Sequence, residues 1–150
     1  TRVRSSAASD VYKRQNKYHA FLILDVDCFK QINDIYGHAV GDIVLQKFGK
    51  LLKGTFREGD ILGRIGGDEF GVIMKNIQTK DIAMKKAEEL LAKTQAYKID
   101  ELKGNNISIS IGISTAPQDG DCYMDLYKRA DQALYQAKRS GKARVCNYFS

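Results

Sequence analysis

Apolar runs and amphipathic stretches alternate along the chain and predict a mixture of strands and helices. Residues 21–24 (Phe-Leu-Ile-Leu) form a continuous apolar run, which is typical of a strand buried on both faces. The isoleucines at 107, 109, 111 and 113 alternate with small polar residues and predict a half-buried strand. Two short apolar segments, 61–65 and 70–74, flank a glycine pair and predict a hairpin. A last strand is expected at 145–149.

Four helices are expected between these strands. A short one covers 29–35 and ends near Gly37, and a longer one follows Gly41 with an apolar stripe at helical spacing. Thr79 is a candidate N-cap for the third helix, and the stripe from Leu126 to Ala137 marks the fourth. The resulting order is β-α-α-β-β-α-β-α-β, which predicts an α+β domain.

Composition limits the class of protein. The chain has 150 residues, 43% of them hydrophobic, which suits one domain with a real core. Three cysteines, an odd number, argue against a disulfide framework and favour a reducing cytoplasm. We find no apolar run of membrane-spanning length, so any membrane anchor of the parent protein would lie upstream. The net charge of +6 is scattered, with no basic stripe of the kind that binds nucleic acid.

The chemistry is concentrated in residues 66–70, Gly-Gly-Asp-Glu-Phe, at the expected hairpin turn. Glycines allow positive φ and close approach of a ligand, and carboxylates at the tip suit a metal–phosphate complex. A second acidic segment, Asp25-Val26-Asp27, ends the buried strand, and strand alternation sends Asp25 and Asp27 to the same side. If the two segments are neighbours, their carboxylates converge. The alternative is a turn with solvated acids.

The chain resembles the GGDEF domains of diguanylate cyclases at these and further positions. The matching blocks appear in family order from about Tyr18 to Phe149, and they are 24–34, 37–42, 64–70, 107–114 and 130–138. The resemblance implies a mixed, largely antiparallel sheet with flanking helices, related to polymerase palms and nucleotidyl cyclases. It also implies that two GTP molecules are condensed into cyclic di-GMP and two pyrophosphates at a homodimer interface.

The resemblance further assigns roles in metal binding and catalysis. Asp25, the Val26 carbonyl and Asp68 would bind Mg²⁺ or Mn²⁺, with Glu69 supporting the metal site. Asp68 would also be the base for the attacking 3′-hydroxyl. Gly66 and Gly67 would make room for the nucleotide phosphates.

Substrate recognition is assigned in the same way. Asn33 and Asp42 would read the guanine edge, with Phe29 also in the substrate-binding set, whereas the alternative for Asn33 and Asp42 is helix capping. Lys138 and Lys142 would contact the β- and γ-phosphates, and a favourable position at a helix C-terminus is compatible with that role.

Arg57 and Asp60 match the family's RxxD motif, which binds the product at an allosteric inhibitory site. A guanidinium can bind a phosphate or a guanine through two hydrogen bonds. The alternative is a solvated surface turn.

The amino terminus differs from the family. Residues 5–15 match the translation of a common sequencing-library adapter, so we interpret 1–15 as a non-native tail and 16–150 as a GGDEF domain without its first helix. We therefore expect low stability and weak activity from this chain. Two rival functions are a non-catalytic receptor that binds cyclic di-GMP or GTP, and a polymerase-like palm module.

Overall fold

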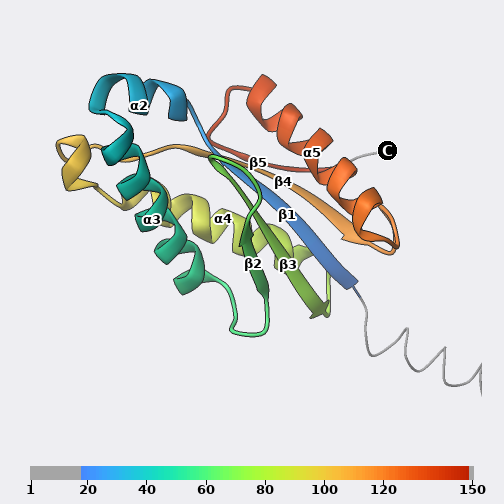
Figure 1. Ribbon diagram of the computed structural model, residues 1–150. Coiled ribbons are helices and arrows are strands. Elements are labelled where there is room, and N and C mark those ends of the chain that lie inside the picture. Colours follow the sequence, from blue (N-terminus) through green and yellow to red (C-terminus); the bar gives the residue numbers. More distant parts are fainter. Residues whose placement is uncertain (1–17, 149–150) are drawn as a thin grey trace, which may run out of the picture.

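The computed structural model describes residues 18–148, and they form a five-stranded sheet flanked by helices (Figure 1). The strand order is β2-β3-β1-β4-β5, in which β5 pairs with β4 in parallel and all other neighbours are antiparallel. The mixed, largely antiparallel sheet is therefore confirmed. The strands are β1 (Tyr18–Val26), β2 (Ile61–Arg64), β3 (Glu69–Ile77), β4 (Ile109–Ala116) and β5 (Val145–Asn147).

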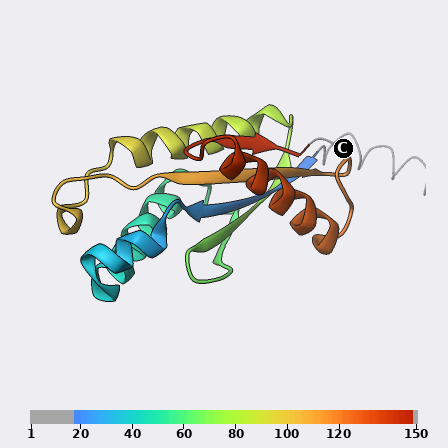
Figure 2. The same ribbon diagram turned by 90° about the horizontal axis from the view of Figure 1, so that it is seen from above.

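The helices of the described residues follow the predicted order. Figure 2 shows α4 and α5 on opposite sides of β4. The face that α3 and α4 cover holds the larger core, and α5 packs on the other face against Phe21 and Ile23. The bounds are α2 (Phe29–Tyr36), α3 (His38–Thr55), α4 (Asp81–Ala96) and α5 (Tyr123–Arg139), with a short 3₁₀ helix at Asp100–Leu102.

The central strand β1 is buried on both faces, as its continuous apolar run predicts. Leu22 and Leu24 point into the core under α3 and α4, whereas Phe21 and Ile23 point toward α5. All four side chains are at most 3% exposed. Because β1 is buried from Ala20 to Val26, a polar group at this end of the strand is held in a low-dielectric setting.

The prediction of a half-buried β4 is wrong, because every residue of this strand is buried. Its small polar residues face α5, not solvent. Ser114 Oγ donates a hydrogen bond to the carbonyl of Leu126, at 2.7 Å. A Cβ on Gly112 would lie 2.8 Å from Leu134 Cα and would overlap the α5 backbone. The small residues therefore let α5 pack directly on the strand.

Two helix starts also differ from expectation. Helix α3 begins at His38, so Gly41 lies inside the helix and not before it. Thr79 does not cap α4, since the N-cap position is Lys80 and no side chain bonds to this helix end. The last strand stops at Asn147, and Phe149 lies outside the described residues, as does the interpretation of residues 1–15.

The α5 side of the sheet also carries exposed apolar side chains. Ile61 is 48% exposed, Ile65 39% and Tyr123 52%. They surround a shallow hollow over β2 and β3 that also touches Phe21 and Ile73.

Among residues 18–148, no helix has the length and apolar character needed to cross a membrane.

Candidate active site

The end of β1 meets the start of β3, and this register brings the two acidic segments together. Asp25 is paired directly with Glu69, and the amide of Val26 donates to the carbonyl of Asp68 at 3.3 Å. The carboxylate of Asp68 lies close enough to that of Asp25 to affect its pKa. The two segments are therefore neighbours, and the convergence expected in that case is present for Asp25 and Asp68.

The turn that carries Asp68 does not use positive φ, contrary to our expectation for Gly66 and Gly67. The amides of Ile65 and Gly66 donate to the Glu69 carbonyl at 2.8 and 3.2 Å, which closes the turn. The guanidinium of Arg64 donates to the carbonyls of Gly66 and Gly67, at 3.1 and 2.9 Å. A Cβ on Gly67 would meet no atom within 4 Å. Gly66 and Gly67 therefore leave open space beside the backbone of the turn.

Asp25 is the electrostatically strained group of the site. It is 7% exposed, and one of its oxygens is bound by the ammonium group of Lys138. The other oxygen, Oδ1, is buried without a hydrogen-bond partner among the described residues. Burial and the neighbouring Asp68 raise the pKa of Asp25 to about 6, although Lys138 acts in the opposite direction. An unpaired buried carboxylate oxygen is available to a cation.

The residues present fit a divalent cation with oxygen ligands. Asp25 and Asp68 offer carboxylates, and the Val26 carbonyl faces the same turn, because N–H and C=O of one strand residue point toward the same neighbouring strand. Within residues 18–148, no three His, Cys, Asp or Glu side chains gather as a metal cluster. Mg²⁺ suits such a site, because it takes one or two carboxylates and completes its shell with phosphate oxygens and water.

Glu69 does not join the two aspartates. Its Oε1 accepts a hydrogen bond from the hydroxyl of Tyr127 on α5, at 3.1 Å. Sequence reasoning did not identify Tyr127. The only signal for it was its spacing of eleven residues from Lys138, which places both side chains on one face of α5.

Asp27 has a structural role that the sequence did not reveal. Its carboxylate accepts hydrogen bonds from the hydroxyls of Ser108 and Ser110, each at 2.6 Å, and from the amide of Ala143 at 3.1 Å. These bonds tie β4 and the segment after α5 to the end of β1. Asp27 thereby fixes the loop that begins α2.

The two lysines predicted to bind phosphate lie at this same end of the sheet. Lys138 occupies the last turn of α5 and reaches Asp25. Lys142 follows that helix, and its Nζ lies 3.2 Å from the sulfur of Cys28 at the start of α2. Lys138 therefore lies beside the two aspartates, and Lys142 lies beside the start of α2.

Asn33 and Asp42 are not helix caps. Each lies inside its helix, α2 or α3, and neither helix start receives a side-chain hydrogen bond. A Cβ on Gly41 would overlap the Asn33 side-chain oxygen and lie 3.2 Å from the ring of Phe29, so Gly41 makes room for both. Asp42 lines a hollow of about 360 Å³, together with Leu45, Gln46, Arg64 and Phe70.

Arg57 and Asp60 lie at the other end of β2, away from the acidic turn. The Asp60 side chain is fully buried and is bound by the Arg57 guanidinium at 2.9 Å and by the Arg57 amide at 3.0 Å. The same guanidinium donates to the carbonyl of Lys75 at 2.7 Å, and the Arg57 side chain remains 51% exposed. The motif is therefore more ordered than a solvated surface turn.

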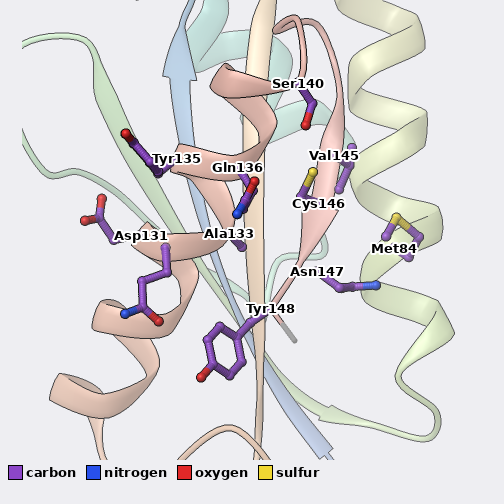
Figure 3. A pocket seen from close by; sticks show the side chains of 11 residues that line it. Met84, Asp131, Ala133, Tyr135, Gln136, Ser140, Val145, Cys146, Asn147 and Tyr148 are labelled. Atoms are coloured by element: carbon purple, nitrogen blue, oxygen red, sulfur yellow. The ribbon is translucent and has the colours of Figure 1, made fainter. Parts of the chain in front are cut away.

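A larger hollow, of about 910 Å³, lies between α4, α5 and β5 and is shown in Figure 3. Its lining includes Met84, Gln136, Cys146 and Tyr148. None of the predicted site residues lines it. Cavity volume alone would therefore direct attention away from the acids.

Comparison with known proteins identifies the family of the chain. Residues 4–144 match the family described as "Diguanylate cyclase, GGDEF domain". Diguanylate cyclase A of Treponema denticola is 40% identical over 127 residues, which cover 84% of this chain and 34% of that protein. The chain therefore spans about a third of the length of this relative.

Solved structures share the fold as well. The GGDEF domain of PA1120 (YfiN or TpbB) from Pseudomonas aeruginosa has a TM-score of 0.86 and 34% identity, covering 97% of this chain and 91% of that one. The GGDEF domain of DgcB from Caulobacter crescentus, in complex with c-di-GMP, has a TM-score of 0.81 and 25% identity, covering 95% and 84%. The chain belongs to the GGDEF family of diguanylate cyclases.

Proposed function

We propose that this domain is a diguanylate cyclase that condenses two GTP molecules into cyclic di-GMP and two pyrophosphates. The observation that carries the proposal is the convergence of Asp25 and Asp68 beside Lys138, with one buried carboxylate oxygen left unpaired. Mg²⁺ or Mn²⁺ bound there would neutralise charge on the transferring phosphoryl group.

The chain's own groups have separate tasks in this reaction. Asp68, on the turn, is the base that accepts the proton of the 3′-hydroxyl. The 3′-oxygen forms a bond to the α-phosphorus of the other GTP, and the bond from that phosphorus to pyrophosphate breaks. Lys138, beside Asp25, and Lys142, beside the start of α2, stabilise the β- and γ-phosphates of the leaving group. Gly66 and Gly67 leave the space that the phosphates need.

Base selection is assigned to the junction of α2 and α3. Asp42 faces the hollow beside the turn, and its carboxylate can accept hydrogen bonds from guanine N1–H and N2–H₂, which adenine lacks. Asn33 and Phe29 complete the substrate-binding set. A site that pairs with polar edges discriminates strongly against analogues without them.

Catalysis requires two copies, because one GTP-loaded protomer supplies one half of the ring. We propose a homodimer in which two acidic turns face each other, and a cytoplasmic location where GTP and a reducing milieu are available.

Arg57 and Asp60 form the product-binding site, a proposal supported by the exposed guanidinium and by the c-di-GMP complex of the related DgcB domain.

The test is incubation of the purified chain with GTP and Mg²⁺, followed by mass spectrometry of the product. We expect cyclic di-GMP, a rate that rises more than linearly with protein concentration, and loss of activity in Asp68→Asn. Asp81→Asn, which makes the same chemical change at an exposed position in the first turn of α4, is the matched control. Binding of cyclic di-GMP without turnover by a folded protein would instead favour the receptor function.

A further inference from the structure

Two carboxylates of the site stand directly opposite each other on one face of the sheet. Asp25 on β1 is paired with Glu69 on β3, and their strand neighbours Phe21 and Ile73, also paired, lie on the same α5-facing side. Directly opposed residues of antiparallel strands have Cβ atoms about 4.5–5.5 Å apart, and like charges in such a pair repel. Glu69 is thus within reach of the Asp25–Asp68 site.

Helix α5 supplies a separate partner to each of these two carboxylates. Tyr127 donates to Glu69 at 3.1 Å, whereas Lys138 binds Asp25. The two α5 residues are eleven positions apart, which is three helical turns or about 16 Å along the axis. Glu69 and Asp25 are therefore directed toward different turns of the same helix.

Tyr127 is itself held in place. Its ring makes an edge-to-face contact with Phe21, with centroids 6.0 Å apart, and a tilted contact with Tyr123 at 6.0 Å. Burial and the adjacent Glu69 raise the pKa of Tyr127, so the phenol stays protonated at neutral pH. The hydroxyl is consequently a fixed donor for the Glu69 carboxylate.

We propose that Tyr127 is a positioning residue that holds Glu69 away from Asp25 and keeps the cation site a two-carboxylate site. The inference rests on the proposed function and names a residue that orders the same site. Without the hydroxyl, a bound cation offsets the repulsion between the two carboxylates, and Glu69 turns toward the cation as a third carboxylate ligand. A site with more carboxylates binds divalent cations more tightly, and the change favours Ca²⁺, which accepts six to eight oxygens, over Mg²⁺.

The experiment measures cation binding to the whole chain without nucleotide. Free Mn²⁺ is followed by electron paramagnetic resonance, and Ca²⁺ by its competition with Mn²⁺. We expect Tyr127→Phe to lower the Kd for Mn²⁺ by at least about threefold, with a larger gain for Ca²⁺. Tyr123→Phe, in the same aromatic cluster, is the matched control and should bind both ions as the parent does. Circular dichroism checks that every variant is folded.

A second background separates positioning from a general effect on packing. In Glu69→Gln the carboxylate is absent, so adding Tyr127→Phe should change neither Kd. Unchanged or weaker Mn²⁺ binding in Tyr127→Phe, or a gain that persists in Glu69→Gln, would overturn the proposal. Because no nucleotide is present, this result does not depend on whether the chain makes cyclic di-GMP. If it does, Tyr127→Phe should lower kcat and leave KM for GTP within about twofold.

Discussion

Replacement of Asp25 by asparagine should abolish cation binding and yet stabilise the metal-free protein at neutral pH. Asp25 is 7% exposed, has an unpaired oxygen, and has a pKa raised to about 6 by burial and by Asp68. The folded chain therefore binds more protons than the unfolded chain between pH 3.8 and about 6. The free energy of unfolding must fall as the pH rises through this range.

The size of the effect follows from the pKa. A carboxyl whose pKa rises from 3.8 to about 6 on folding costs about 3 kcal/mol when it is ionised in both states. At pH 4 the cost is only about 0.5 kcal/mol, because the folded carboxyl is protonated and the unfolded one, close to its pKa of 3.8, is only partly ionised. This cost is net of the attraction to the partly exposed Lys138, which lowers the pKa of Asp25 and which asparagine loses. We therefore expect a net gain of about 1–3 kcal/mol at pH 7.5.

Urea unfolding in EDTA, at pH 7.5 and pH 4, measures this difference directly. Asp27→Asn is the control, because Asp27 accepts three hydrogen bonds, and a neutral amide weakens these charge-assisted bonds, at a cost of about 1–3 kcal/mol at pH 7.5. Saturating Mg²⁺ should stabilise the parent and leave Asp25→Asn unchanged. The reasoning fails if Asp25→Asn is no more stable than the parent at pH 7.5, or if its gain is the same at pH 4.

Three other substitutions test separate features. Gly112→Ala should lower the free energy of unfolding in urea by about 1–3 kcal/mol, because its Cβ overlaps the α5 backbone. The control Gly49→Ala lies in open space inside α3 and should raise it by about 0.5–1 kcal/mol. Equal effects of the two substitutions would refute the close approach of α5 to Gly112. Asn33→Ala and Asp42→Ala should each reduce the preference for GTP over ATP in calorimetry, and an unchanged preference would remove them from base recognition. Arg57→Ala should weaken cyclic di-GMP binding away from the active site and relieve product inhibition, so an unchanged Kd would end the inhibitory-site interpretation.

The element order was predictable from the sequence because burial leaves a periodic signature. The run from 21 to 24 identified the central strand, and the apolar stripes identified the helices. The error at β4 has a physical cause. Alternation of isoleucine with serine and glycine indicates one polar face, but it does not say whether that face meets water or a helix. In β4 the small residues lie directly against the backbone of α5.

The candidate site was predictable only where it depends on neighbouring strands. Alternation along β1 and a hairpin turn are local properties, and they bring Asp25 and Asp68 together only if β1 lies beside the hairpin, which is the pairing found in the structure. The partners supplied by α5 are not local. Lys138 and Asp25 are 113 residues apart, and Tyr127 and Glu69 are 58 apart. No periodicity in the sequence reports such distances, so the hydroxyl that orients Glu69 could not be predicted.

The position of α5 links the fold to the chemistry. Because Gly112 has no side chain, the backbone of α5 packs directly against β4. The Asp27 carboxylate accepts a hydrogen bond from the Ala143 amide and so holds the segment that follows the helix. With both ends of the contact fixed, one face of α5 presents a donor to each of two opposed carboxylates. A shift of the helix by a fraction of a turn would leave Glu69 and Asp25 without their partners. Gly112 is therefore required to keep the cation site a two-carboxylate site, and Gly112→Ala should lower stability and, by separating Tyr127 from Glu69, should tighten Mn²⁺ binding as is expected of Tyr127→Phe.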